Sequence, residues 1–369
     1  MLTPAAAPAA LSPDVRGATV LVTGGAGFVG SHLCIRLAES GAQVIALDNL
    51  SRRGSELNVD RLRAAGVEFV RGDVRYAQDL EFAGRSIDWI VDCAAEPSVT
   101  AGYGDGSRYV VETNLVGTLN CLELARRAGA RVCFLSTSRV YPTARLNALD
   151  VVEDETRFRL AGAQSQAGAS AAGVSEDFAL EGARTLYGAS KLASELLLTE
   201  YGDANGVEFV VNRLGVISGP GQMGKVEQGI FSLFMARHVF GGTLRFIGWG
   251  GSGKQVRDLV HVEDVWELLV AELRQWATVR GRTFNAGGGA SVSLSLQETV
   301  ALCHELTGVA LAVQHEPATR HGDVRVYVSD HAALTAATGW APRRDARAIL
   351  RDLRDWMEED RERLQPVFE

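Results

Sequence analysis

The sequence contains no apolar run of the ~18 residues that a membrane-spanning helix needs. Its first residues, Met1 to Asp14, lack the basic stretch and apolar core of a signal peptide. Positive charge is in deficit as well, since 37 lysines and arginines stand against 45 aspartates and glutamates, for a formal net charge of −8. An acidic chain has no general attraction for nucleic acid or anionic membrane. We therefore expect a cytoplasmic protein with neither partner, in which an anionic substrate would need a local basic pocket.

Cysteine is scarce and scattered. The five cysteines are Cys34, Cys93, Cys121, Cys133 and Cys303, and no two of them stand in a C-x-x-C spacing. Most lie in apolar surroundings, which is typical of reduced thiols in a protein core. The pattern argues against a disulfide framework and against a zinc site, and no metal is expected.

The first half of the 369-residue chain alternates short apolar runs with helix-like stretches. Strands are expected over residues 18–23, 43–47, 67–70, 87–91, 131–136 and 207–212, and helices over 28–40, 109–128 and 189–201. This alternation predicts an α/β fold, a Rossmann-type doubly wound parallel sheet covered on both faces. Beyond residue 214, glycine-rich segments separate shorter elements, which predicts a smaller C-terminal α/β lobe for the substrate.

Domain boundaries follow from these changes in the sequence pattern. We assign residues 1–16 to a flexible tail and 17–213 to the nucleotide-binding domain, with 259–287 returning to it. Residues 214–258 and 288–369 are assigned to the substrate lobe. Within 142–184 the alternation breaks, and residues 161–173 are almost all Ala, Gly, Ser and Gln. So long a stretch without periodicity is often functional or mobile. It is interpreted as a flexible segment near the substrate mouth or, alternatively, a disordered surface insertion.

A glycine-rich turn joins the first predicted strand to the first helix. Its sequence is Gly24-Gly25-Ala26-Gly27-Phe28-Val29-Gly30. Glycines at these spacings permit a tight turn, close approach of the backbone to a pyrophosphate, and close helix–strand packing. The helix N-terminus then offers free N–H groups to the phosphates. We expect a dinucleotide to bind at Gly24, Gly27, Phe28, Val29 and Gly30.

Acidic residues after the next two strands indicate which dinucleotide binds. Asp48 stands eighteen residues after Gly30, where a carboxylate accepts hydrogen bonds from the adenosine ribose and would repel a 2′-phosphate. NAD is therefore expected as the cofactor, although Arg52 and Arg53 leave NADP as an alternative. Asp73 is placed to meet the adenine edge, unless it is only a turn residue.

A tyrosine and a lysine four residues apart predict the catalytic centre. In Tyr187-Gly-Ala-Ser-Lys191 the two side chains share one helix face. The lysine ammonium is expected near the tyrosine oxygen, where it would lower the tyrosine pKa. Tyr187 could then remove an alcohol proton while hydride leaves the carbon. Thr137, at the end of the preceding strand, is expected in the crevice where ligands bind, in hydrogen-bond reach of the reacting oxygen.

Together these motifs resemble the extended short-chain dehydrogenase/reductase family, also called the NAD-dependent epimerase/dehydratase family, over roughly residues 17–345. The supporting segments are residues 23–30, 48–50, 72–74, 93–95, 114–118, 136–138, 187–191 and 255–258. The resemblance implies that Thr137, Tyr187 and Lys191 form the catalytic set and that Lys191 also holds the nicotinamide ribose. It further implies that Asn49, Val74, Ala94, Ala95 and Asn114 belong to the cofactor site.

The same resemblance implies a nucleotide-diphosphate sugar as substrate. Arg257, in Gln255-Val256-Arg257-Asp258, would bind the diphosphate, for which bidentate arginine is well suited. Asp258 would orient Arg257 or contact the sugar of the nucleoside. The remaining predicted substrate-binding residues are Ser138, Arg139, Gln222 and Gln255. Val216 stands where many sugar epimerases carry a diphosphate-binding asparagine, which leaves that contact unassigned.

A narrower resemblance links residues 48–58, 219–224, 253–258 and 284–289 to the CDP-tyvelose (CDP-paratose) 2-epimerases. It implies an isomerase of carbohydrate biosynthesis that oxidises C2 of a CDP-sugar with retained NAD and returns hydride to the opposite face. The sequence departs from this group around residues 139–183. A homodimer is also expected, through pairing of the helices over 109–128 and 189–201, unless their apolar faces only cover the sheet.

Several alternatives remain at this point. One is a nucleotide-sugar C4 epimerase, and another is a net NAD(H)-dependent reductase that exchanges its cofactor at every turnover. A 4,6-dehydratase of the family carries an Asp-Glu pair after the active threonine, where this sequence has Ser138 and Arg139. Arginine stays protonated and cannot act as that acid or base. A remote alternative is a non-catalytic dinucleotide-sensing protein, against which the intact Y-x-x-x-K argues.

Overall fold

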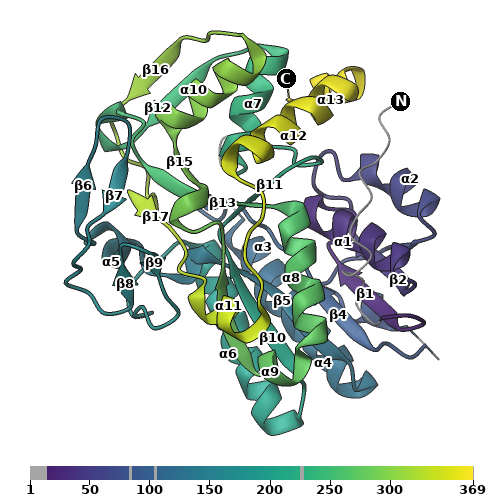
Figure 1. Ribbon diagram of the computed structural model, residues 1–369. Coiled ribbons are helices and arrows are strands. Elements are labelled where there is room, and N and C mark those ends of the chain that lie inside the picture. Colours follow the sequence, from purple (N-terminus) through teal and green to yellow (C-terminus); the bar gives the residue numbers. More distant parts are fainter. Residues whose placement is uncertain (1–14, 83–84, 104–105, 225–227, 369) are drawn as a thin grey trace.

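The computed structural model describes residues 15–82, 85–103, 106–224 and 228–368. Of the expected flexible tail, residues 1–16, the first fourteen lie outside the described residues. The larger lobe is built on a parallel sheet with the strand order β14-β10-β5-β4-β1-β2-β3 (Figure 1). Its strands are β1 (Thr19–Thr23), β2 (Gln43–Asp48), β3 (Glu68–Arg71), β4 (Trp89–Asp92), β5 (Arg131–Thr137), β10 (Phe209–Leu214) and β14 (Arg282–Ala286).

Helices cover both faces of this sheet because successive strand residues point to opposite sides. Val20 and Val22 of β1 belong to a core shared with the helices α1 (Phe28–Glu39), α2 (Glu56–Ala64) and α8 (Val262–Arg274). Leu21, between them, belongs to the core shared with α4 (Gly117–Ala128) and α6 (Leu186–Asn205). The predicted Rossmann-type, doubly wound sheet is therefore confirmed.

The chain returns to the larger lobe after entering the smaller one. After α8 and α9 (Trp276–Val279), strand β14 pairs with β10 at the edge of the sheet. Helix α11 (Ala332–Thr338) then packs Leu334 into the core of the larger lobe, and Trp340 joins it there. These last two residues fall in the range that the sequence assigns to the substrate lobe.

The smaller lobe is also α/β. Strands β11 (Val216–Ser218), β13 (Val256–His261), β15 (Ser293–Ser295) and β17 (Val326–Tyr327) form one sheet, and β12 (Leu244–Ile247) pairs with β16 (Val313–Glu316). Its helices are α7 (Ile230–Phe240), α10 (Leu296–Thr307), α12 (Ala346–Glu359) and α13 (Arg361–Phe368). Phe231, Phe234 and Leu353 lie in their common core. In the parts of the chain that the structure describes, no helix is long and apolar enough to cross a membrane.

The predicted helix over residues 109–128 is one helical stretch with an interruption. Helix α3 (Ser107–Val111) continues through a π-helical turn, Glu112–Val116, into α4. Such turns occur frequently at functional sites. Here the turn carries Asn114, which is fully buried.

The segment 142–184 contains several short elements joined by turns. It contains α5 (Thr143–Asn147) and two hairpins, β6 (Val151–Glu153) with β7 (Phe158–Leu160) and β8 (Ala169–Ser170) with β9 (Gly173–Val174). The Gln164 side chain donates to the Asp150 carbonyl at 2.8 Å, and the Val174 N–H donates to the Val328 carbonyl at 2.8 Å. The prediction of a stretch without structure was wrong, because these turns are closed by hydrogen bonds that composition does not reveal.

Candidate active site

A cavity of about 870 Å³ lies along the carboxyl ends of the central strands and is lined by residues of both lobes. This volume is near the upper end of the range for ligand pockets. Most predicted site residues line it: Gly24, Gly27, Phe28, Val29, Gly30, Asp48, Asn49, Asp73, Val74, Ala94, Ala95, Thr137, Ser138, Arg139, Tyr187, Gln222, Gln255 and Arg257. Asn114, Lys191 and Asp258 are not among its lining residues.

The glycine-rich turn is too tightly packed to accept side chains. Gly24 has a φ of +61°, a conformation that favours glycine. A Cβ on Gly30 would lie 2.1 Å from the Gly24 carbonyl oxygen. The first turn of α1 therefore rests directly on the loop, and the backbone N–H groups of the helix N-terminus are left open to the cavity. This cradle fits the pyrophosphate of a dinucleotide.

Asp48 connects this loop to the end of β2. Its carboxylate accepts hydrogen bonds from the Ala26 N–H at 3.0 Å and the Leu50 N–H at 2.8 Å. Burial raises the pKa of Asp48 although these bonds oppose the shift. Of the two neighbouring arginines, Arg52 lines the cavity, whereas the Arg53 side chain donates to the Pro366 carbonyl.

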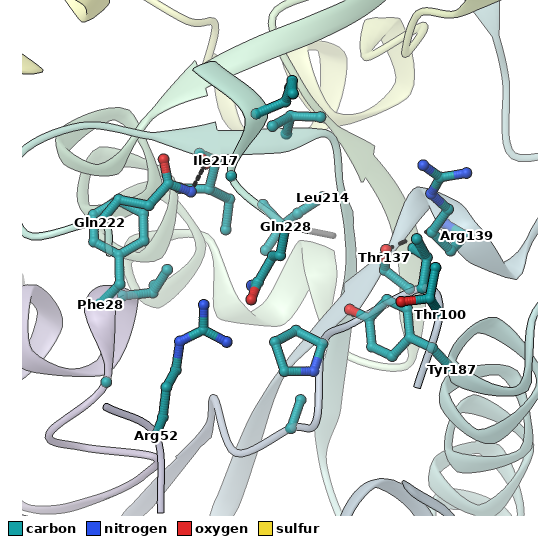
Figure 2. Close-up of a pocket in the computed structure, with 18 of the residues that line it drawn as sticks. Phe28, Arg52, Thr100, Thr137, Arg139, Tyr187, Leu214, Ile217, Gln222 and Gln228 are labelled. Carbon is teal, nitrogen blue, oxygen red and sulfur yellow. Dashed lines mark hydrogen bonds between the residues drawn. The ribbon is translucent and has the colours of Figure 1, made fainter. Parts of the chain in front are cut away.

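Thr137 and Tyr187 bring their hydroxyls together inside the cavity (Figure 2). Thr137 ends β5, and its hydroxyl accepts from the Arg139 N–H at 3.2 Å, which starts a short 3-10 turn over Ser138–Val140. Tyr187 lies in the first turn of α6, which Thr185 caps by accepting from the Gly188 N–H. Both side chains line the same cavity. Tyr187 as a base and Thr137 as a hydrogen-bonding hydroxyl could thus act on one substrate oxygen.

The electrostatics around Tyr187 differ from the expectation. Burial raises its pKa above the ordinary value, while the hydrogen bond from Thr137 and the charge of Arg139 oppose that rise. Lys191 is 1% exposed, and its ammonium lies 3.7 Å from the centroid of the Phe134 ring. The effect of Lys191 on the pKa of Tyr187 stays a prediction. The lysine shares a helix face with the tyrosine, but its ammonium is directed toward Phe134.

Asn114 supports the catalytic helix from behind. Its amide nitrogen donates to the Ser190 hydroxyl at 3.0 Å, and its amide oxygen accepts from the Glu96 N–H at 2.8 Å. Ser190 in turn donates to the Tyr187 carbonyl at 2.9 Å. Asn114 thus braces α6 between Tyr187 and Lys191 rather than reaching the cavity.

On the substrate side, Arg257 is held by a residue that the sequence did not indicate. Its guanidinium donates to Asp323 and to the Val256 carbonyl, each at 2.8 Å. Asp258 is fully buried, accepts from the Ser329 N–H at 3.1 Å, and does not line the cavity. The prediction that Asp258 orients Arg257 or contacts the nucleoside was wrong, because neighbouring side chains on strand β13 point to opposite faces.

The two predicted glutamines are used differently. The amide of Gln222 is occupied within the protein, since it donates to the Ile217 carbonyl at 2.8 Å and accepts from the Ser218 hydroxyl at 3.0 Å. Gln255 donates to the Ile247 carbonyl at 2.9 Å. Its Oε1 is buried without a hydrogen-bond partner in the described structure and is available to a ligand donor.

Sequence reasoning missed half of the arginines of the cavity, namely Arg237, Arg245 and Arg320. The lining includes six arginines and three aspartates: Arg52, Arg139, Arg237, Arg245, Arg257 and Arg320, with Asp48, Asp73 and Asp323. Spacing could not reveal the Arg257–Asp323 pair, whose members stand 66 residues apart. A chain of net charge −8 thus builds a locally basic pocket, as an anionic ligand requires. No residue of 142–184, a segment that the structure describes in full, lines this cavity, although Asn147 donates to the carbonyl of the lining residue Asp323 at 3.0 Å.

Comparisons with known proteins agree with this geometry. Residues 20–287 match the family model described as the NAD dependent epimerase/dehydratase family. The chain is 31% identical to the CDP-paratose 2-epimerase of Salmonella typhi over 344 residues, 91% of this chain and 98% of the relative. It is 28% identical to the UDP-glucose 4-epimerase of Erwinia amylovora over 363 residues, 93% of this chain and 98% of the relative. The solved UDP-glucose 4-epimerase of Thermus thermophilus in complex with NAD superposes with a TM-score of 0.74 at 30% identity, covering 92% of this chain and 99% of that one.

Proposed function

Since the chain belongs to the NAD dependent epimerase/dehydratase family and uses NAD, we propose that it is a nucleotide-sugar epimerase. The observation that carries this proposal is that Thr137 and Tyr187 line the same cavity as the glycine-rich turn. When bound, NAD supplies the hydride acceptor and later the hydride donor. The chain's own residues must then move one proton and hold one sugar in place.

Each residue has a separate task in this proposal. Tyr187 removes the proton of a sugar hydroxyl and later returns it, and Thr137 holds the reacting oxygen by a hydrogen bond. Arg257, fixed by Asp323, binds the diphosphate and so places the sugar next to Tyr187. Lys191 and Asn114 support the cofactor side of α6. These assignments rest on the burial, contacts and cavity positions given above.

Epimerisation is favoured over elimination by the two residues after Thr137. Ser138 and Arg139 stand where a 4,6-dehydratase needs a second acid and base, and arginine remains charged. A ketone formed next to Tyr187 therefore meets no second acid and base at these two positions that could eliminate water, and it takes hydride back instead. We place the reaction at C2 of a CDP-sugar, by similarity to the CDP-paratose 2-epimerase, with C4 as the alternative that the UDP-glucose 4-epimerases support.

The test is isomer formation without added cofactor. CDP- and UDP-sugars are incubated with the purified protein, and products are identified by nuclear magnetic resonance. Wild-type protein should form a diastereomer of one of them. Tyr187→Phe keeps the ring but removes the proton acceptor, so turnover should fall by roughly 10²-fold or more. Binding of the nucleotide should survive. Wild-type turnover by this variant would show that Tyr187 is not the base.

A further inference from the structure

The segment 142–184 contacts the substrate side of the cavity through Asn147, the last residue of α5. The side-chain amide of Asn147 donates to the Asp323 carbonyl at 3.0 Å and accepts from the Arg325 N–H at 3.0 Å. The orientation of this amide is fixed, because a carbonyl can only accept and an N–H can only donate. One side chain thus holds the backbone on both sides of Val324. Asn147 itself does not line the cavity.

Arg325 adds to this contact. Its guanidinium donates to the Asn147 carbonyl at 3.3 Å and to the Leu149 carbonyl at 3.2 Å. Its own carbonyl accepts from the Val256 N–H at 3.0 Å, and Val256 directly precedes Arg257 on β13. The backbone from residue 323 to residue 325 is therefore bound both to the end of α5 and to the strand that carries Arg257.

Asp323 connects this backbone to the ligand site. Its Oδ1 accepts from the Arg257 guanidinium at 2.8 Å and from the Val324 N–H at 2.9 Å. A second nitrogen of that guanidinium donates to the Val256 carbonyl at 2.8 Å, and its remaining N–H groups stay available to an anion in the cavity. The position of the Arg257 guanidinium thus depends on the backbone of Asp323, which Asn147 holds.

A second side chain holds the residue before Asp323. Arg139 donates to the Gly322 carbonyl at 3.0 Å. Gly322 has a φ of +75°, and a Cβ on it would lie 2.4 Å from Cγ2 of Thr185, the residue that caps α6. The turn at Gly322 therefore packs directly against the start of the catalytic helix. Together, Arg139 and Asn147 hold residues 322–325 in place.

We propose that Asn147 is a positioning residue for the substrate diphosphate, which acts through Asp323 on Arg257. This inference rests on the proposed function, in which Arg257 binds the diphosphate. Because Asn147 lies outside the cavity lining, its effect on affinity cannot come from direct contact with a ligand in the cavity. Arg139 lines the cavity, so its replacement would not make that distinction.

The experiment measures the affinity of the NAD-loaded protein for CDP and for UDP by isothermal titration calorimetry. Both nucleotides carry the diphosphate without the sugar. Arg257→Met should weaken binding of the preferred nucleotide by about tenfold or more, and Asn147→Ala by about tenfold, the scale of a net hydrogen bond or two. In the Arg257→Met background, Asn147→Ala should change the affinity no further, because the guanidinium that it positions is absent.

Two further variants complete the experiment. Asn147→Asp keeps the acceptor for the Arg325 N–H and loses only the donor to Asp323, so it should also weaken binding, and it gives the same test if Asn147→Ala does not retain NAD. Gln164→Ala is the matched control. The Gln164 amide accepts from the Asp150 N–H at 3.0 Å and donates to the Asp150 carbonyl at 2.8 Å, within the same segment. Its replacement should leave both affinities unchanged.

Three results would overturn the inference. The first is unchanged affinity in a folded Asn147 variant, as judged by circular dichroism and bound NAD. The second is an equal loss in Gln164→Ala, which would assign the effect to a general loosening of the segment. The third is a loss that persists undiminished in the Arg257→Met background.

Failure of this inference is distinct from failure of the proposed function. Weaker binding by Arg257→Met with wild-type binding by Asn147→Ala would refute the role of Asn147 alone. Wild-type binding of both nucleotides by Arg257→Met would instead refute the assignment of the diphosphate to Arg257, and the role of Asn147 would fall with it.

Discussion

Glu272 should make the stability of the larger lobe depend on pH. The residue lies on α8, is fully buried, and accepts one hydrogen bond, from the Asn212 amide at 3.0 Å. Its other oxygen and the Asn212 amide oxygen have no hydrogen-bond partner in the described structure. Burial raises the pKa of Glu272 from 4.5 to about 8. A protonated carboxyl is therefore preferred in the folded state.

The sign and size of the effect follow from that shift. Between pH 4.5 and about 8 the folded protein holds a proton that the unfolded chain has lost. The stabilisation is complete below pH 4.5 and is lost as pH rises through about 8. Each pH unit in this window lowers the free energy of unfolding by about 1.4 kcal/mol, or about 5 kcal/mol across the whole window. Glu272→Gln is neutral at every pH and offers an N–H donor to Asn212, so it should abolish this slope.

The assay is urea unfolding at saturating NAD, followed by tryptophan fluorescence from about pH 5 to about pH 9. The advantage of Glu272→Gln over wild type should grow steadily with pH and level off above about pH 8. Glu200→Gln, the same substitution at an exposed position of α6, should follow the wild-type curve. Parallel curves for Glu272→Gln and wild type would refute the reasoning, because Glu272 would then be ionised in both states or in neither.

Two further predictions concern the cofactor and the assembly. Gly30→Ala places a Cβ 2.1 Å from the Gly24 carbonyl oxygen, so it should lower the free energy of unfolding by about 1–3 kcal/mol. It should also reduce the amount of NAD that co-purifies, which is measured after denaturation. An undiminished amount of NAD would contradict the inference that this turn is too tight for a side chain. We also propose a homodimer through α4 and α6, where Leu196 is 66% exposed in the single chain. Leu196→Glu should then give a monomer by light scattering with intact secondary structure, whereas a monomeric wild type would remove the proposal.

Local pattern was enough to predict where the glycine-rich turn, Asp48 and Tyr187 lie in the fold. The glycine-rich turn, Asp48 and the Tyr187–Lys191 spacing are each confined to one strand–helix junction or one helix, and the structure places them at the carboxyl ends of β1 and β2 or at the start of α6. Most of the parallel sheet could also be predicted from short apolar runs, whereas β14, with the sequence Arg-Thr-Phe-Asn-Ala, was not among the expected strands. The sequence analysis also did not predict α2 or the π-helical turn at Asn114.

The substrate half depended on contacts between distant segments. Asp323 contacts Arg257 only because residues 320–323 lie beside β13, and no periodicity in the sequence predicts that position. The direction of Asp258 followed from strand alternation, which required knowing that β13 begins at Val256. The orientation of Lys191 could not be predicted either, because helical spacing fixes the face but not where a long side chain ends.

In the proposed reaction, hydride leaves and returns at the same sugar carbon. CDP- and UDP-sugars carrying deuterium at C2 or at C4 are given to the enzyme with no added cofactor, and the product is examined by mass spectrometry and nuclear magnetic resonance. An epimerase that retains NAD should form a diastereomer that keeps its deuterium, with a primary isotope effect from the label on the reacting carbon and no accumulation of NADH. Stoichiometric consumption of added NADH, with a reduced sugar as product, would contradict it.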